Sequence, residues 1–531
     1  NLNPAFSVRE YQKEALGRFY YYCEEYHQKQ KPIHLMFNMA TGSGKTLIMA
    51  ANILYFYQKG YRNFIFFTRL GNIIQKTKAN FLDPNSKKYL FADKIVLNGQ
   101  EVKIKEVDNF EGVNNGDINI IFTTISGLHR RFNEAKEGVL TFEDLADKKI
   151  VLLGDEAHNF QAQTAREEEE EKNTWEKTIL GNTRDLFNTL GILNANREKE
   201  NVLLEFTATA RLDDEAIKEK YKDKAIYRYD LKEFRLDGFS KEVETKQIDA
   251  SMMERVLSAV IISQYRRKVA EKHKISLKPV ILFKANQVNP PKDATKLQGA
   301  NPMIVLSGEF KAKFHQFISG LTVFDLETIS TIRETSEHKT LSDAFDFFKK
   351  HKITHENLVA EIKSDFAPEK CLTVDEDKDL EQKQILLNSL EDQNNEIRAI
   401  FATEKLNEGW DVLNLFDIVR LYDSRDARAN RPGKTTVQEA QLIGRGARYF
   451  PFTIGEFTDS YRRKFDGQPK EELKILEQLF YHSTHNPDYI SELRKAMVET
   501  GIIASYTKQY EIKIKKKFKD TDFWKKGYIF L

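Results

Sequence analysis

The heptapeptide ATGSGKT at Ala40–Thr46 decides the fold of this chain. It follows the apolar run IHLMFN at Ile33–Asn38 and precedes LIMAANILYFY at Leu47–Tyr57, a segment rich in helix-forming residues. A strand, a glycine loop and a helix in this order are the context that a phosphate-binding loop requires. Gly42 and Gly44 allow the backbone to curl, so that successive N–H groups point inward at phosphate oxygens. The stretch therefore predicts an α/β fold that holds a nucleotide at the start of a helix.

The side chains of this loop suit ATP. Lys45 supplies a positive charge for the β and γ phosphates, and the Thr46 hydroxyl can bind Mg²⁺. Thr41 and Ser43 complete the set of expected ATP-binding residues in the loop. Met39 stands where the general GxxxxGK[ST] pattern has its first glycine, which leaves the GKT core intact. A plain Gly-Ser-Gly turn would need neither the lysine nor the threonine.

A second element, KKIVLLGDEAH, places two carboxylates directly after an apolar strand. Asp155 is positioned to hold Mg²⁺, and Glu156 to orient and deprotonate the attacking water. Carboxylates at this place can also simply cap the next helix. Because phosphoryl transfer needs both a phosphate cradle and a metal-and-water site, the upstream loop favours the catalytic interpretation.

A third element, VQEAQLIGRGARYF, brings guanidinium groups from the other half of the chain. Gln441, Arg445 and Arg448 have the spacing i, i+4 and i+7, which predicts one shared helical face. Gly444 and Gly446 weaken a helix, so part of this stretch could be a turn. Guanidinium groups suit the charge that develops on a transferring γ-phosphoryl group. The alternative is that the arginines bridge surface carboxylates.

Short apolar runs alternate with helical patterns, which favours parallel α/β layering. The expected strands of the first half are Ile33–Asn38, Asn63–Thr68, Ile118–Thr124, Ile150–Leu153 and Val202–Phe206. A second α/β pattern has expected strands at Pro279–Phe283, Ile397–Phe401 and Phe416–Leu421. We expect a first domain at residues 1–235, a second at 236–515 with an insertion at about 287–393, and a C-terminal extension at 516–531.

Bulk composition excludes some classes of protein. Lys and Arg (82) nearly balance Asp and Glu (80), so net charge says little about a nucleic-acid partner. Two distant cysteines, Cys23 and Cys371, exclude a disulfide framework and a cysteine zinc site. Neither a signal peptide nor an apolar run of about 18 residues is evident, so we expect a soluble, cytoplasmic protein.

The motifs together resemble superfamily-two helicases, in which ATGSGKT, DEAH, the TAT of LLEFTATA and QLIGRGAR occur in this order. Within that superfamily, VREYQ, IRAIFATEKLNEGWDVLNLFDIVRLYD, QLIGRGARYFPF and FYHSTHNPDYISELRKAMVETG resemble the restriction (Res) subunit of type III restriction-modification enzymes. The resemblance covers nearly the whole chain and is weakest at 287–375. It implies two RecA-like domains in tandem, with ATP and Mg²⁺ between them. It also implies DNA and a modification (methyltransferase) subunit as partners.

The resemblance implies roles for further residues. Gln12 would read the adenine edge, and Gly409 and Asp411 would lie near the nucleotide. Hydrolysis would be coupled to domain movement by His158, Thr207 and Thr209. The nucleic-acid backbone would be contacted by Thr68, Thr123, Thr124 and Thr403. Small hydroxyls grip phosphates without reading bases, as a motor that steps over any sequence requires.

The expected function is an ATP-dependent DNA translocase or helicase motor that hydrolyses ATP at a domain interface. Type III Res subunits also carry a C-terminal nuclease domain, but no nuclease constellation precedes Leu531, so we expect it to be absent from this chain. Two other functions stay open: an ATP-gated switch or scaffold without translocation, and an RNA helicase.

Two weaker patterns have structural alternatives. His482 and His485 in HSTH could bind a metal, but no third ligand is near in the sequence, which favours a structural role. Ile512–Lys519, IKIKKKFK, predicts a strand with one basic face. It could contact phosphate or be an edge strand that lysines protect from pairing.

Overall fold

The structure is a computed structural model. It describes residues 1–69, 71–133, 145–157, 176–181, 191–208, 210, 215–247, 251–285, 307–331, 339–374, 380–403, 412–422, 433–468 and 471–503. Some predicted site residues lie outside these ranges: His158, Thr209, Gly409 and Asp411. The basic segment Ile512–Lys519 also lies outside them.

A seven-stranded parallel sheet forms the first half of the chain, with the order β5-β6-β2-β7-β8-β1-β9. Its strands are β1 (Ile33–Met39), β2 (Asn63–Thr68), β5 (Ile104–Glu106), β6 (Ile118–Thr124), β7 (Ile150–Asp155), β8 (Val202–Thr207) and β9 (Ala225–Tyr229). A separate antiparallel pair consists of β3 (Ile95–Leu97) and β4 (Gln100–Val102). All five strands expected from the sequence of this half are present.

Helices cover the sheet on two faces, and the burial of β2 shows why this strand is apolar throughout. Phe64 and Phe66 join one buried cluster, and Ile65 and Phe67 join another. A parallel strand that is covered on both faces reads as a continuous apolar run. The helices are α1 (Glu10–Glu24), α2 (Lys45–Gln58), α3 (Gly71–Leu82), α4 (Ile125–Asn133), α7 (Glu215–Tyr221) and α8 (Leu231–Leu236), with a short π-helix η2 (Glu176–Leu180) and a 3₁₀ helix η3 (Ile192–Asn194).

The second half contains a six-stranded parallel sheet with the order β10-β15-β14-β11-β13-β12. Its strands are β10 (Glu242–Gln247), β11 (Val280–Lys284), β12 (Cys371–Thr373), β13 (Ala399–Ala402), β14 (Leu415–Arg420) and β15 (Gln478–Ser483). The chain therefore has two RecA-like parallel-sheet domains in tandem. β12 is an edge strand of this sheet, although it falls within the stretch for which an insertion was expected.

The helices of the second half pack around this sheet and extend beyond it. They are α9 (Met252–Lys272), α11 (Ser307–Gly320), α12 (Val323–Thr331), α13 (Lys339–Lys350), α14 (His355–Asp365), α15 (Leu380–Asn388), α16 (Lys434–Gly446) and α17 (Pro487–Glu499), with 3₁₀ helices η5 (Pro368–Lys370) and η7 (Glu472–Glu477). Helices α11 to α14 contribute to the same buried cluster as α9. Among the described helices, none has the length and apolar character that crossing a bilayer requires.

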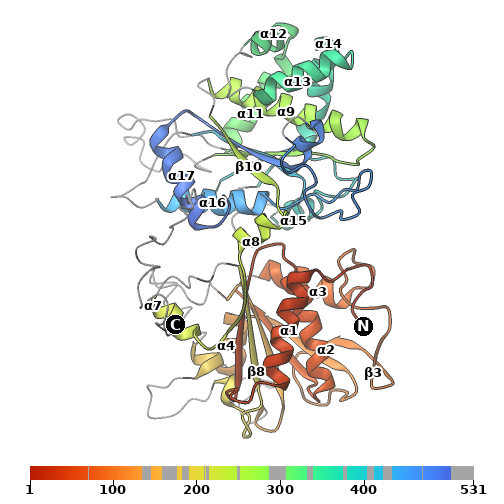
Figure 1. Ribbon diagram of the computed structural model, residues 1–531, viewed down its shortest axis with the longest axis vertical. Coiled ribbons are helices and arrows are strands. Elements are labelled where there is room, and N and C mark those ends of the chain that lie inside the picture. The colour runs from red at the N-terminus through yellow and green to blue at the C-terminus, as the bar shows by residue number, and fades with distance from the viewer. Residues whose placement is uncertain are drawn as a thin grey trace, which may run out of the picture.

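The two domains form two lobes along the long axis of the molecule (Figure 1). Helix α8 lies at their junction, and α11 to α14 lie at the far end of the second lobe. The lobes touch: the Lys87 ammonium of the first lies 2.5 Å from the Asp392 carboxylate of the second. Because the two lobes are in contact, residues from both domains can share a site between them.

Candidate nucleotide site between the two domains

The loop after β1 has the backbone of a phosphate cradle. Gly42 and Gly44 have φ angles of +84° and +85°, which glycine adopts at little cost and other residues rarely do. Gly44 is also the N-cap of α2, and a side chain on it would collide with the amide of Gln12. Glycine is therefore required at the start of α2, where the positive end of the helix dipole favours an anion.

Helix α1 fixes this loop from one side. The Gln12 side-chain amide donates to the Ser43 carbonyl at 2.7 Å, and the Tyr11 hydroxyl donates to the same oxygen at 3.0 Å. The Gln12 side-chain oxygen accepts from the Arg9 backbone N–H at 3.0 Å. Gln12 is buried, and its side chain holds the loop through the Ser43 carbonyl. Its proposed contact with adenine stays a prediction.

Arg9 makes contacts that were not predicted from the sequence, with α1, with the segment between α8 and β10, and with the second domain. Its guanidinium lies 4.6 Å from the ring centre of Phe239, between α8 and β10, and 5.0 Å from that of Tyr461 in the second domain. It also donates to the Tyr11 hydroxyl at 3.0 Å. A cation between two rings is favourable and links the loop support to the domain junction. The VREYQ motif was the available signal for this contact.

Lys45 and the acid pair belong to one electrostatic group. Burial lowers the pKa of Lys45, while the nearby Glu156 and Asp155 carboxylates oppose that shift. Its ammonium donates to the Met39 carbonyl at 3.3 Å. Strand β8 lies between β1 and β7, so Thr207 at its end falls between the loop and the acid pair. The fold therefore brings Lys45, Asp155, Glu156 and Thr207 together at the carboxyl ends of the strands β1, β7 and β8.

Glu156 has an unusual backbone. Its φ is +53°, in the left-handed region that non-glycine residues seldom occupy, and its N–H donates to the Asp155 carboxylate at 3.0 Å. Such strain is common at functional sites, where surrounding structure holds a residue in place. Burial and the adjacent Glu156 raise the pKa of Asp155 to about 7, which Lys45 opposes. A buried carboxylate of this kind fits a divalent cation, because the cation would keep it ionised.

The shared helical face predicted for the arginine motif is wrong for Arg448. Helix α16 includes Gln441 and Arg445 but ends at Gly446. Arg448 instead pairs with Ser240 in an isolated antiparallel bridge. The physical reason is the weak helix propensity of the two glycines, which the sequence had signalled.

Arg448 reaches across the interface to the phosphate loop. A Cβ atom placed on Gly42 would lie 3.3 Å from the Arg448 Nε atom. Burial lowers the pKa of Arg448 to about 10, while Glu391 and Glu156 oppose that shift. Arg445 is half-buried in the last turn of α16, and Gln441 is exposed. The structure thus brings a guanidinium of the second domain against the loop of the first.

Lys76 on α3 belongs to the same group, although no motif contains it. Burial and the nearby Arg448 lower its pKa to about 7, and Glu391 opposes the shift. Its charge in turn opposes the rise in the pKa of Asp155. Sequence reasoning missed Lys76 and Glu391 because only the fold brings them to the interface.

The residues expected to contact a nucleic-acid backbone are mostly covered in this conformation. Thr68 and Thr403 are buried. The Thr123 hydroxyl donates to the Thr124 carbonyl at 3.2 Å, and the Thr124 hydroxyl accepts from the Gly127 N–H at 3.0 Å at the start of α4. Their contacts with nucleic acid stay predictions.

His482 has a structural role. It lies in β15 with no exposed surface, and its Nε2 atom lies 3.0 Å from the Asp417 carboxylate. Among the described residues there is no cluster of His, Cys, Asp and Glu that could hold a metal ion. The buried pair with Asp417 joins β15 to β14 inside the second sheet.

Comparisons with known proteins identify the family of this chain. A family model described as "Type III restriction enzyme, res subunit" matches residues 5–212. A Haemophilus influenzae protein described as "Probable type III restriction-modification enzyme HindVIP Res subunit" is 36% identical over 457 residues. The match covers 80% of this chain and 85% of that protein. The chain belongs to the family of type III restriction enzyme Res subunits.

Other similarities to this Res-family chain are partial or distant. A second family model, HI_1054_N ("N-terminal region"), matches residues 435–506. Saccharomyces cerevisiae Dbp5 bound to RNA and ADP BeF3 has 13% identity and a TM-score of 0.43, covering 92% of this chain and 87% of Dbp5. The type ISP restriction-modification enzyme LlaBIII bound to DNA has 11% identity and a TM-score of 0.42, covering 94% of this chain and 33% of LlaBIII.

Proposed function

We propose that this Res-family chain is an ATP-dependent DNA translocase or helicase motor, and that ATP is hydrolysed between its two domains. One observation carries the proposal: Arg448 of the second domain lies against Gly42 of the first. Residues of both domains would therefore bind the same terminal phosphate, which ties hydrolysis to domain closure.

Each residue of the site has a role in this mechanism. The loop N–H groups and Lys45 bind the phosphates. Thr46 and Asp155 would hold Mg²⁺, which supplies positive charge to the phosphate oxygens when bound. Glu156 orients the attacking water and accepts its proton. Arg448, with Arg445, stabilises the negative charge that develops on the transferred phosphoryl group.

The coupling to movement follows from the division of the site. The loop, the acid pair and Thr207 are in the first domain, and the arginines are in the second. Binding of ATP favours the closed arrangement, and loss of the terminal phosphate removes what holds the arginines there. Contacts with the DNA backbone on both domains would convert each cycle into a step. In this proposal, recognition of the DNA sequence belongs to the modification subunit.

A comparison of nucleic acids tests the substrate. We expect duplex or single-stranded DNA to stimulate ATP hydrolysis more than RNA does, with a stimulation that weakens as salt rises. Stronger stimulation by RNA would favour an RNA helicase instead.

Displacement of an annealed third DNA strand tests translocation. The unaltered chain should strip the third strand in the presence of ATP, and Glu156→Gln should not. Arg462→Met provides the control, because Arg462 is not a residue of the nucleotide site. This variant should displace the third strand as the unaltered chain does. DNA-stimulated hydrolysis without strand displacement would mean that the chain is an ATP-gated switch and not a motor.

A further inference from the structure

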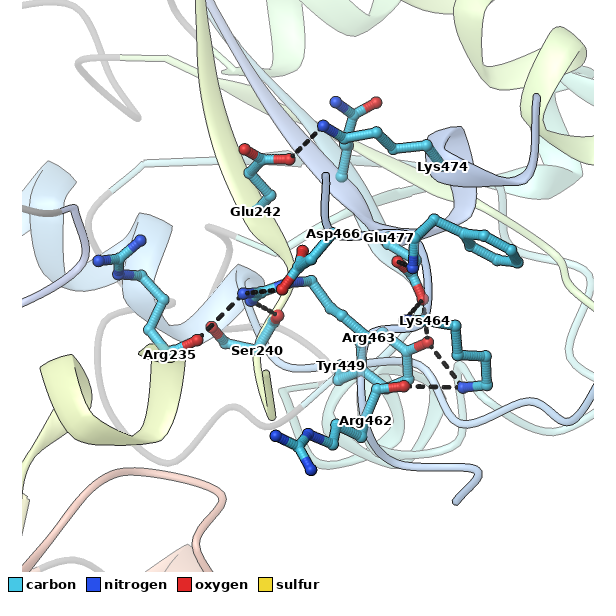
Figure 2. A network of polar contacts seen from close by, with 12 residues as sticks. Arg235, Ser240, Glu242, Tyr449, Arg462, Arg463, Lys464, Asp466, Lys474 and Glu477 are labelled. Carbon is cyan, nitrogen blue, oxygen red and sulfur yellow. Dashed lines mark hydrogen bonds and ion pairs between the residues drawn. The ribbon is translucent and has the colours of Figure 1, made fainter. Parts of the chain in front are cut away.

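The segment that connects the two domains is held by one arginine of the second domain. The Arg463 guanidinium donates to the Ser240 carbonyl at 2.5 Å and to the Arg235 carbonyl at 3.1 Å. Its backbone N–H donates to the Gly238 carbonyl at 2.8 Å. Figure 2 shows Arg463 reaching both carbonyl oxygens and the carboxylate of Asp466. We call residues 235–241 the linker.

Arg463 is itself held in place. Asp466 accepts two hydrogen bonds from the guanidinium, at 2.8 and 2.9 Å, and the side chain of Arg463 is only 8% exposed. The hydrogen bond from Arg463 lowers the pKa of Asp466. A paired, forked contact of this kind fixes the guanidinium plane, so its remaining N–H groups point at the linker.

The segment that carries Arg463 is anchored to the second domain. The Glu477 carboxylate accepts from the Tyr449 hydroxyl at 2.7 Å and from the backbone N–H groups of Lys464 and Phe465 at 2.7 and 3.0 Å. These contacts lie beside Arg463 in Figure 2. Arg463 therefore fixes the linker to the frame of the second domain.

The other end of the linker contacts the arginine motif directly. Ser240 pairs with Arg448, and the Lys241 N–H donates to the Ala447 carbonyl at 2.6 Å. The Lys241 ammonium donates to the Gly446 carbonyl at 3.0 Å and to the Leu415 carbonyl at 2.7 Å. Ser240 thus contacts both the Arg463 guanidinium and, in the bridge, the backbone of Arg448.

We propose that Arg463 is a positioning residue for Arg448, an inference that rests on the proposed ATPase activity. By holding the Ser240 carbonyl, Arg463 sets the strand pair from which Arg448 reaches the phosphate loop. Without that contact the pair shifts, and the Arg448 guanidinium loses its place over Gly42. Small displacements of a group that acts in the transition state cost rate and leave ground-state binding nearly unchanged.

Arg463→Met tests this role, with Arg462→Met as the matched control. Arg462 is the adjacent residue and carries the same charge. The stem of its side chain packs against Gly238, a contact that methionine retains, but no described hydrogen bond joins its guanidinium to the linker. We expect Arg463→Met to lower kcat about tenfold. The Kd for a fluorescent ADP analogue should stay within about twofold. Arg462→Met should leave both unchanged. Equal kcat values for the two variants would overturn the proposal.

A milder variant and a thermal melt separate positioning from misfolding. Asp466→Asn keeps Arg463 but weakens its orientation, so kcat should fall in the same direction by about threefold. Both variants should melt at nearly the temperature of the unaltered chain. A drop in kcat that comes only with lost ADP binding or a lower melting temperature would make Arg463 a stability residue and overturn the proposal.

A double-mutant cycle with Arg448→Ala gives the decisive readout. If Arg463 acts through Arg448, then Arg463→Met should not lower kcat further in the Arg448→Ala background. Multiplicative effects of the two changes would contradict the proposal. If Arg448→Ala alone leaves kcat unchanged, the role proposed for Arg448 in hydrolysis is wrong. Because that variant still contains Arg463, this outcome is distinguishable from a failure of the role proposed for Arg463.

Discussion

The two domains present their site residues in different ways. In the first domain, Asp155 and Thr207 end parallel strands, and Lys45 begins the helix that follows another strand. In the second domain, Arg448 lies beyond the end of α16 and is fixed by Ser240, which is far away in the sequence. The half of the site proposed to bind phosphate is therefore built locally, while the arginine half depends on the domain junction.

The largest expected effect is in the locally built half. Lys45→Ala removes the charge on the phosphates, and Glu156→Gln removes the base, so each should lower the ATPase rate by more than about 10³-fold. Glu156→Gln should still bind a fluorescent ADP analogue, because the loop is intact. Lys59→Ala, at the exposed residue that follows α2, is the control. Activity near that of the unaltered chain in either variant would remove the loop and acid pair from the mechanism.

The arginine half should show a smaller but specific loss. Arg448→Ala should lower kcat by about 10²- to 10³-fold, because a guanidinium that acts on the transition state is missing. ADP binding should change little, since in the proposed mechanism the loop and α1 would hold the nucleotide without it. Single-turnover hydrolysis measures this directly. A weakened affinity with unchanged kcat would show that Arg448 serves binding and not the reaction.

The same contrast explains what the sequence could predict. ATGSGKT and the acid pair were identified because each sits on one strand end, where residue type and spacing are sufficient. Arg448 was identified as a residue, but the helical face assigned to it was wrong because glycines end α16 early. Lys76, Glu391 and Arg463 gave no signal, since only the packing of distant segments brings them to the site or to the linker.

Stability offers a third comparison, within the second domain. The Asp365 carboxylate at the end of α14 accepts from Arg398 at 2.6 Å and from Gln264 at 2.7 Å, and it also pairs with Arg267. Asp365→Asn would leave the buried Arg398 guanidinium without its counter-charge and should cost about 3 kcal/mol. Urea unfolding of the second domain measures this, with Glu327→Gln, at an exposed position on α12, as the control. Equal midpoints for the two variants would contradict it.

Acid should weaken the ion pairs that Asp365 makes with Arg398 and Arg267. Burial alone would raise the pKa of Asp365, but Arg398 and Arg267 outweigh it and lower the pKa to about 2. A depressed pKa stabilises the fold above the unfolded value of about 4 and loses that contribution as the pH falls toward 2. Between pH 5 and pH 2 (roughly), the unaltered chain should therefore lose more stability than Asp365→Asn. Parallel curves of unfolding midpoint against pH would exclude this contribution.

The smallest expected effect concerns the ion pair that spans the lobes on the surface. The side chains of Lys87 and Asp392 are 85% and 46% exposed, and exposed pairs contribute little because water and salt screen them. Lys87→Ala should change the KM for ATP by no more than about twofold, and only at low salt. Arg463→Met, buried at the linker, should have the larger effect on kcat at any salt concentration. If Lys87→Ala lowered kcat more than Arg463→Met does, closure would depend on surface charge. The linker would then not be the element that positions Arg448.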